Sequence, residues 1–174
     1  MNTDSDQYQF YWKGPFSQWH PSEFLLDGEM FQTAEQAMMY LKAKLFNDEE
    51  TATEIQATRD PGKQKALGRK VRGFDDAVWD RNKVDIVTRV NLAKFSQNKG
   101  LRRKLFQTGD KILAEASPLD TIWGIGLSAQ DAANTDPAIW PGQNLLGQII
   151  TNVRASLALQ HPNEVKACAP APKE

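Results

Sequence analysis

Cysteine, histidine and long apolar runs are almost missing from this sequence of 174 residues. Its one cysteine, Cys168, cannot form an internal disulfide, so a reducing compartment is the expected environment. The two histidines, His20 and His161, are far apart, and no Cys/His set has the spacing of a zinc site. No run of about 18 apolar residues occurs, so no segment is expected to span a membrane. We expect no metal, no other cofactor and no membrane partner.

A strong excess of either charge is also missing. The formal net charge of -1 excludes a generally basic nucleic-acid binder, although a local basic patch remains open. The first residues, which include Asp4 and Asp6, lack the basic and apolar regions of a signal peptide. We therefore expect a cytoplasmic protein, with the nucleus as the alternative.

What the sequence does contain is enough apolar material for one folded domain. Hydrophobic residues make up 40% of the chain and charged residues 25%, which is ordinary globular usage. Residues 1–8 are polar, and residues 159–174 contain three prolines with few large apolar side chains. Both ends are therefore expected to be disordered tails, on either side of a single domain at residues 9–158.

Several local signals predict the secondary structure. Asp27-Gly28 favours a type I′ turn, and so a hairpin between the apolar stretches on either side. Thr33-Ala-Glu-Gln36 is a capping box that begins a helix at Thr33. Further helices are expected from Pro61 to Gly73, from Asp75 or Asp76 to about Gln97, from about Leu101 to Gly109, and from a cap at Asn144 onward. Strands are expected at 9–12, 22–26, 29–31 and 112–116. The predicted class is mainly α with a few short β-strands, in one compact domain.

The most informative segment is Ala116-Ser-Pro-Leu-Asp120-Thr-Ile-Trp123-Gly124-Ile-Gly126-Leu. Proline and glycines keep this segment from forming an ordinary helix, and a carboxylate precedes an indole by three residues. A site that stacks Trp123 on a ring and directs Asp120 toward it fits this pattern. In the structural alternative Asp120 caps a turn and Trp123 belongs to the core. The dinucleotide fingerprint that begins at Gly124 is rejected, because Pro118 and Asp120 interrupt the strand it requires.

Glu35 is a second candidate carboxylate. In the first turn of its helix, the helix dipole favours the ionised form by roughly 0.3–1 kcal/mol. That form suits a nucleophile, a base for water or a partner for a cationic transition state, although first-turn acids are also common for stability alone. Lys42 shares a helical face with Glu35, roughly 10 Å along the axis, and a ligand could span both. Lys44 lies on another face.

A basic stretch follows Pro61. Lys65, Arg69 and Arg72 have the spacing i, i+4, i+7 and would share one helical face. Such a face is either solvated or meets an anion such as phosphate. Gly68 weakens a helix by about 1 kcal/mol relative to alanine, which close approach of a ligand or another helix would explain.

The loop Phe16-Ser17-Gln18-Trp19-His20 is aromatic and polar. Loops on rigid scaffolds often line sites, although Phe16 or Trp19 could equally cover the core.

Taken in order, these segments resemble the NADAR family, also called YbiA-like. The resemblance covers about residues 9 to 158, and its motifs are Phe16-Ser-Gln-Trp19, Thr33-Ala-Glu35-Gln36, Tyr40-Leu-Lys42-Ala-Lys44, Ala66-Leu-Gly68-Arg69, Trp79, Lys94-Phe95, Glu115-Ala-Ser-Pro-Leu-Asp120-Thr-Ile-Trp123-Gly-Ile-Gly126 and Asn144-Leu-Leu-Gly147.

The resemblance implies a metal-independent N-glycosidase, a hydrolase that cleaves the bond between a ribose C1 and a nitrogen. Glu35 would be its essential carboxylate and Asp120 the partner of Glu35. The implied substrate contacts are phosphate or ribose at Lys42, Lys44 and Arg69, a ring at Trp123 and Phe16, and other ligand contacts at Ser17, Gly124 and Asn144. Many relatives read Ser-Asn-Phe where this chain reads Ser17-Gln18-Trp19, a departure that concerns base recognition.

Three functions follow from the resemblance. The first is removal of ADP-ribose from ADP-ribosylated guanine, in a nucleotide or a nucleic acid. The second is hydrolysis of early riboflavin-synthesis intermediates, which are small ribosylaminopyrimidine phosphates. The third is a non-catalytic module that binds ADP-ribose or NAD.

Overall fold

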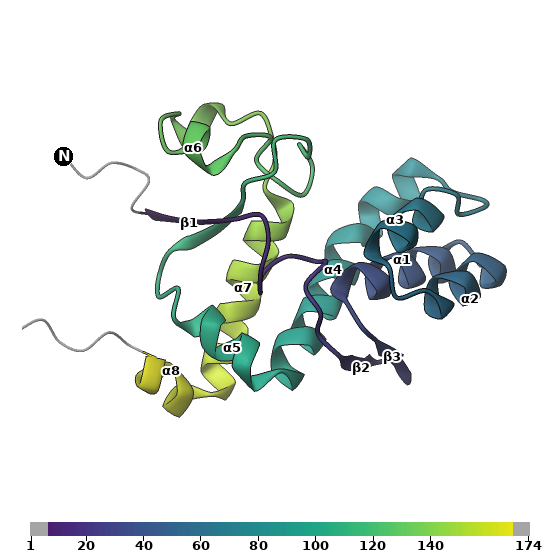
Figure 1. The fold of residues 1–174 in the computed structure, drawn as a ribbon, viewed down its shortest axis with the longest axis horizontal. Coiled ribbons are helices and arrows are strands. Elements are labelled where there is room, and N and C mark those ends of the chain that lie inside the picture. Colours follow the sequence, from purple (N-terminus) through teal and green to yellow (C-terminus); the bar gives the residue numbers. More distant parts are fainter. Residues whose placement is uncertain (1–6, 169–174) are drawn as a thin grey trace, which may run out of the picture. The chain divides into compact units, whose positions relative to one another are not determined.

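The computed structural model describes residues 7–168 (Figure 1). Its contacts divide the chain into two compact units: a first unit of residues 7–17 and 99–168, and a second unit of residues 18–98. Helices predominate and the strands are short, which confirms the mainly α class. Within the described residues, no helix is both long and apolar enough to cross a bilayer.

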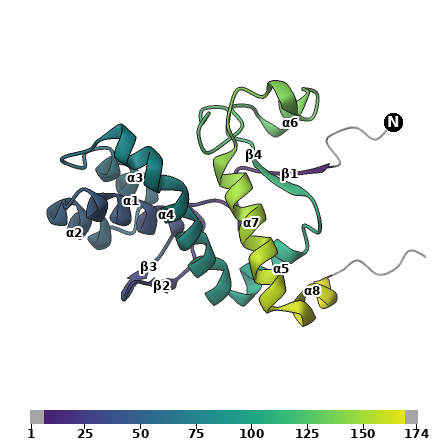
Figure 2. The same ribbon diagram turned by 180° about the vertical axis from the view of Figure 1, so that it is seen from behind.

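The second unit consists of one β-hairpin and four helices. Helix α1 contacts all three other helices, as the views in Figures 1 and 2 show. A core of Phe24, Phe31, Val90 and small alanines fills the space between the hairpin, α1 and α4. The elements are β2 (Phe24–Leu26), β3 (Glu29–Phe31), α1 (Ala34–Leu45), α2 (Glu49–Ala57), α3 (Pro61–Gly68) and α4 (Asp76–Gln97).

The hairpin and the start of α1 form as their local sequences predict. Asp27 and Gly28 both have positive φ, 52° and 84°, which a type I′ turn requires. The Thr33 hydroxyl accepts from the Gln36 amide at 3.1 Å and so caps α1. The second half of the capping box differs, because the Gln36 side chain accepts from the Gln32 amide at 2.8 Å.

Side-chain amides cover the edges of this hairpin. The Gln97 side chain donates to the Leu25 carbonyl and accepts from the Leu25 amide, both at 2.8 Å, so it imitates a paired strand. On the other edge, Gln56 donates to the Met30 carbonyl at 2.8 Å. These contacts satisfy edge groups that would otherwise be open to pairing with another chain.

The first unit has a parallel pair of strands covered by a helix. Strands β1 (Tyr8–Tyr11) and β4 (Ile112–Glu115) pair in register from Tyr8 opposite Ile112 to Tyr11 opposite Glu115. Helix α7 packs along β4 (Figure 2). The other elements are α5 (Lys99–Phe106), α6 (Ala129–Ala132), a short 3-10 helix (Pro137–Ile139), α7 (Leu145–Gln160) and α8 (Pro162–Cys168).

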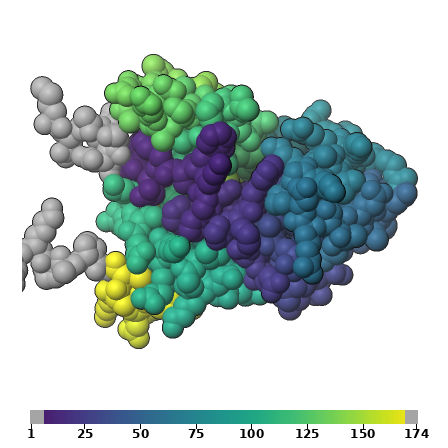
Figure 3. Space-filling view, viewed as in Figure 1, coloured from purple at the N-terminus to yellow at the C-terminus, as the bar shows by residue number. Residues whose placement is uncertain are grey.

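The prediction of a disordered tail from residue 159 needs correction. Residues 159 and 160 complete α7, and α8 follows at once and packs beside α5 (Figure 3). The Arg102 guanidinium holds the Glu164 carboxylate at 2.9 and 3.1 Å, and this contact lowers the pKa of Glu164. An ion pair with distant α5 therefore anchors a segment whose composition suggests no structure. Residues 1–6 and 169–174 of the predicted tails lie outside the described residues, and Tyr8 belongs to β1.

Candidate active site

Glu35 is the second residue of α1, and its carboxylate is nearly buried. The side chain is 6% exposed, and the Glu35 amide donates to the Gln18 carbonyl at 2.9 Å. Gln18 is buried too, and its side chain accepts from Asn91 at 3.1 Å. The chain before β2 therefore fixes the first turn of α1 from outside the helix. A carboxylate held here lies near the positive end of the helix dipole, which stabilises its charge.

Lys42 lies further along α1, half-buried between a helix end and two rings. Its ammonium donates to the Gly68 carbonyl at 2.8 Å, 4.3 Å from the Phe74 ring centre and 5.4 Å from that of Trp79. Gly68 ends α3, so the lysine compensates an unpaired carbonyl at the negative end of that helix. Burial lowers the pKa of Lys42, while the charges of Asp76 and Glu35 oppose this change.

Arg69 comes directly after α3 and is exposed. Its positive charge is close enough to lower the pKa of Lys42 further. We call Glu35, Lys42, Gly68 and Arg69 the Glu35 cluster. The fold thus gathers three predicted site residues, one anionic and two cationic, within the second unit. Such a cluster can hold an anionic sugar phosphate beside a carboxylate.

The packing of α3 against α1 explains why a glycine stands at position 68. A Cβ on Gly68 would lie 2.0 Å from the Met39 sulfur and 2.9 Å from its Cγ. A side chain at position 68 would therefore force the Met39 side chain to move, and glycine lets α3 pack closely on α1 without that change. Of the two explanations open from the sequence, the structure supports the neighbouring helix.

Lys44 is separate from this cluster. It is exposed and forms an ion pair with Glu49 at 2.5 Å, which raises the pKa of the lysine. The pair links the end of α1 to the start of α2. Any role of Lys44 in binding phosphate requires this surface pair to open.

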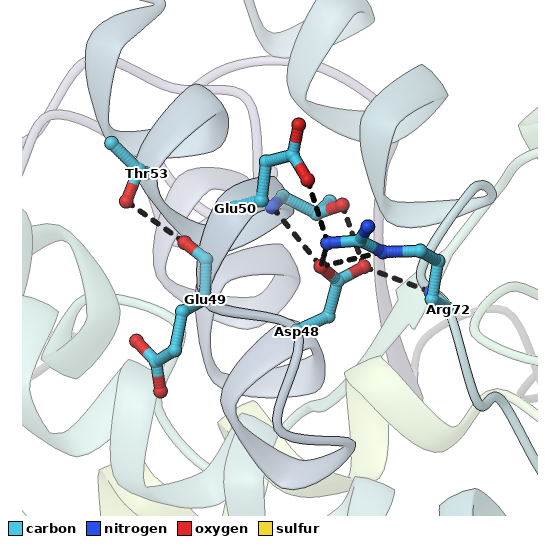
Figure 4. Close-up of polar contacts among 6 residues, drawn as sticks. Asp48, Glu49, Glu50, Thr53 and Arg72 are labelled. Atoms are coloured by element: carbon cyan, nitrogen blue, oxygen red, sulfur yellow. Dashed lines mark hydrogen bonds and ion pairs between the residues drawn. The ribbon is translucent and has the colours of Figure 1, made fainter.

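The predicted basic face of one helix is wrong. Helix α3 ends at Gly68 rather than at Gly73, so Lys65, Arg69 and Arg72 do not share a helical surface. Asp48, the cap of α2, accepts from the Arg72 amide at 2.9 Å and from its guanidinium at 2.7 Å (Figure 4). Glu50 adds a contact at 2.9 Å. Arg72 therefore neutralises negative charge at the start of α2. Its hydrogen bonds hold the pKa of Asp48 well below its usual range.

Asp120, in the first unit, organises its own loop. Its Oδ1 accepts from the amides of Ile122 at 3.0 Å and Trp123 at 2.8 Å, while its carbonyl accepts from Gly126 at 3.1 Å. We call residues 116–127 the Asp120 loop. One carboxylate oxygen of Asp120 therefore caps a turn, as the structural alternative predicts.

The Asp120 loop also accepts hydrogen bonds from the first amides of α7. The amides of Leu145 and Leu146 donate to the carbonyls of Ile122 and Trp123 at 3.2 and 3.1 Å. A Cβ on Gly124 would lie 2.9 Å from the carbonyl oxygens of both Asp120 and Glu115, so only glycine fits. Trp123 is partly buried, and its backbone is held at both ends by these contacts. The loop is therefore a rigid platform.

Asn144 stands at the predicted cap position of α7 but does not cap the helix with its side chain. Its φ is 53°, and the side-chain amide accepts from Glu115 and donates to Leu113, both at 3.0 Å. The side chain of Asn144 thus satisfies backbone groups of β4 that a neighbouring strand would otherwise pair. The capping prediction is wrong because β4 lies close enough to take both polar ends of the side chain.

Phe16 and Ser17 lie just after β1. The Phe16 ring is 9% exposed and packs edge-on against Tyr11, with ring centres 5.6 Å apart. Ser17 closes a tight turn by donating from its amide to the Gly14 carbonyl at 3.0 Å. Phe16 therefore contributes to the core of the first unit, and its predicted contact with substrate stays a prediction.

The family model of the NADAR domain matches residues 8–158. The chain belongs to the NADAR domain family. Most of both units falls within the match, and it contains every predicted site residue.

Several curated relatives of this NADAR chain are N-glycosidases by name. It is 49% identical over 144 residues to N-glycosidase R617 of Acanthamoeba polyphaga mimivirus, covering 80% of this chain and 85% of that protein. It is 39% identical over 158 residues to protein irg-1 of Caenorhabditis elegans, covering 82% and 74%. The relatives support an N-glycosidase in the general sense.

The fold has a solved counterpart. The NMR structure of YbiA from E. coli superimposes with a TM-score of 0.73, covering 97% of this chain and 92% of that one at 24% identity. The likeness establishes the fold. The described residues of this NADAR chain contain no group of three or more His, Cys, Asp or Glu side chains placed to hold a metal ion.

The structure adds a residue to which the sequence analysis assigned no role. Lys94 on α4 is 0% exposed, and burial lowers the pKa of its amine to about 7. An amine with a pKa near 7 is partly neutral at that pH, and its neutral form can act as a nucleophile or a base. In the sequence, the only indication of a role for Lys94 is its place in the family motif Lys94-Phe95. In the structure the Phe95 ring beside it is fully buried on α4.

Tyr11 and Glu115 lie opposite each other at the end of the parallel strands. Tyr11 is buried, and its pKa is raised first by burial and then by the charge of Glu115. Glu115 is the register partner of Tyr11 and lies just before the Asp120 loop. In the sequence, the only indication of a role for Glu115 is that it is the first residue of the family motif that ends at Gly126.

Proposed function

We propose that this chain is an N-glycosidase that hydrolyses the bond between a ribose C1 and a base nitrogen, and that it removes ADP-ribose from ADP-ribosylated guanine. The observation that carries the proposal is the nearly buried carboxylate of Glu35, held at a helix start in a cluster with Lys42 and Arg69. The N-glycosidase names of the relatives support the reaction type.

The chemistry follows from these residues. When the C1–N bond breaks, its electron pair stays on the base nitrogen and the ribosyl carbon becomes oxocarbenium-like. A fixed carboxylate in a water-poor site stabilises that positive charge. Glu35 also takes a proton from the attacking water, whose oxygen bonds to C1, and the proton passes to the departing nitrogen. In this proposal Lys42 and Arg69 bind the phosphate of the substrate.

A riboflavin-related substrate is the second candidate. The maize protein named riboflavin biosynthesis protein PYRR, chloroplastic, is 30% identical over 108 residues, covering 60% of this chain and 16% of that protein. The reaction would be the same on a smaller phosphate ester, with a pyrimidine as the leaving group. The Glu35 cluster serves either substrate, because both carry a ribose and phosphate.

The test is the Glu35→Gln variant, assayed on ADP-ribosylated guanine nucleotide and on ribosylaminopyrimidine phosphate by release of the sugar. We expect kcat to fall by roughly 10²–10⁴-fold on the true substrate. The matched control is Glu54→Gln, the same change at an exposed position on α2, which should keep full activity. Circular dichroism checks that both variants are folded.

Wild-type rates from Glu35→Gln would refute the role of the carboxylate. Turnover of only one substrate decides between the two candidates. Tight binding of ADP-ribose by calorimetry, without turnover of either substrate, would instead show a binding module.

A further inference from the structure

The ammonium of Lys42 lies beside two aromatic rings that stand at the start of α4. Phe74 comes two residues before this helix, and Trp79 belongs to its first turn. The Lys42 Nζ atom is 4.3 Å from the ring centre of Phe74 and 5.4 Å from that of Trp79. Both distances are within the reach of about 6 Å that is typical of cation–π contacts. The proposed function assigns no role to either ring.

The position of Phe74 is fixed by the segment that carries it. Asp48 accepts from the Arg72 amide at 2.9 Å and from its guanidinium at 2.7 Å. Gly73 then turns the chain with a φ of 71°. The Phe74 ring packs on that of Phe46, the last residue of the α1 end, with ring centres 5.3 Å apart. The ring is therefore anchored to the cap of α2 and to the end of α1.

The surroundings of the Lys42 ammonium leave it able to bind an anion. An ammonium has three N–H donors, and the Gly68 carbonyl accepts one of them at 2.8 Å. An aromatic face attracts the positive charge through its quadrupole, so it compensates lost hydration without acting as a conventional acceptor. The other donors can therefore turn to a bound anion.

A lysine that is already in place binds an anion at lower cost. Holding a lysine in one conformation costs more side-chain entropy than holding most other residues. Where the fold has ordered the side chain, that cost no longer opposes binding. Lys44 on the same helix offers the contrast, because it is exposed and paired with Glu49, which an anion would have to displace.

We infer that Phe74, with Trp79 as a second ring, is a positioning residue that holds the Lys42 ammonium ready to bind a phosphate-type anion. The inference rests on the proposed function, since it concerns the phosphate contact of the same site. Arg69, directly after α3, supplies a second positive charge close to Lys42. Phe74 acts through Lys42 and needs no contact with the substrate.

The experiment changes the ring in steps. Phe74→Ala removes the ring, Phe74→Leu keeps an apolar side chain without an aromatic face, and Phe74→Tyr keeps that face. Affinity for inorganic pyrophosphate is measured by calorimetry, and KM and kcat are measured on the ribosylated substrate that the wild type turns over. The matched control is Leu25→Ala, which removes another half-exposed apolar side chain (49% exposed) from the same unit.

We expect Phe74→Ala to weaken pyrophosphate binding by about 3- to 10-fold and to raise KM similarly, with kcat changed far less. Phe74→Leu should be as weak as Phe74→Ala, whereas Phe74→Tyr and Leu25→Ala should match the wild type. A double-mutant cycle links the ring to the lysine. In a Lys42→Met background, which itself binds pyrophosphate weakly, Phe74→Ala should cause no further loss. Circular dichroism checks that every variant is folded.

The outcomes separate this inference from the proposed function. If no ribosylated substrate is turned over but pyrophosphate affinity follows the cycle, the proposed function fails and the positioning role stands. If turnover depends on Glu35 while Phe74→Ala keeps the wild-type affinity and KM, the positioning role fails alone. Recovery by Phe74→Leu would show that the ring only packs, and an undiminished loss in the Lys42→Met background would show that it does not act through the lysine. Either result overturns the inference, as does the absence of pyrophosphate binding by the wild type.

Discussion

Replacement of Lys94 by methionine should remove much of the pH dependence of folding. Burial lowers the pKa of this amine to about 7, from 10.5 for an exposed lysine. Between these two values the unfolded chain binds one more proton than the folded chain. The free energy of unfolding therefore rises with pH in this window, by about 1.4 kcal/mol per pH unit.

The magnitude follows from the same two pKa values. Below pH 7 the folded amine is protonated as well, so the contribution flattens there. From pH 6 to pH 9 the linkage relation gives a gain in stability of about 2–3 kcal/mol from Lys94 alone. Methionine has a similar length and no titrating group, so Lys94→Met should lack this gain.

The assay is urea denaturation at pH 6, 7, 8 and 9, followed by circular dichroism. The quantity to compare is the rise in the free energy of unfolding from pH 6 to pH 9, in the wild type and in the variant. Lys104→Met is the control, because Lys104 is exposed on α5, and it should keep the wild-type rise. An equal rise in the wild type and Lys94→Met would refute the burial argument.

Two further variants test the packing of the second unit. Gly68→Ala should destabilise the fold by about 1–3 kcal/mol in thermal melts, because its Cβ meets Met39. In Met39→Ala the same change should cost less, and an equal cost in both backgrounds would contradict the clash. Asp48→Asn should lower stability at neutral pH by weakening the Arg72 pair. Because the folded pKa of Asp48 is depressed, the difference from the wild type should shrink as the pH falls below about 4. A difference that does not shrink at all between pH 4 and pH 2 would exclude the carboxylate charge as its source.

Local elements could be predicted because their signals act over a few residues. The turn at Asp27-Gly28, the caps at Thr33 and Asp75 and the proline that begins α3 all lie where the sequence places them. The sequence predicts that α3 ends at Gly73, whereas the helix ends at Gly68. Arg72 bonds to Asp48 across 24 positions, and no local pattern reports that contact.

The candidate site was predictable only in its residue types. The sequence pointed to Glu35 and Asp120 as carboxylates worth testing, and to cations near Glu35. It could not show that Asp120 uses one oxygen to hold its own loop, or that Asn144 serves β4. It did not reveal that Lys94 is enclosed, because burial depends on every element that packs around α4.

By itself the sequence determined the helical class, the turn at Asp27-Gly28, the caps at Thr33 and Asp75, and the family, since these depend on residue order and short spacing. The tertiary structure decided the partner of each charged side chain: the end of α3 for Lys42, Glu49 for Lys44 and the cap of α2 for Arg72. The physical reason is that a charge takes its protonation state and its partner from what the folded chain brings within a few ångströms, and residues far apart in sequence supply most of those neighbours.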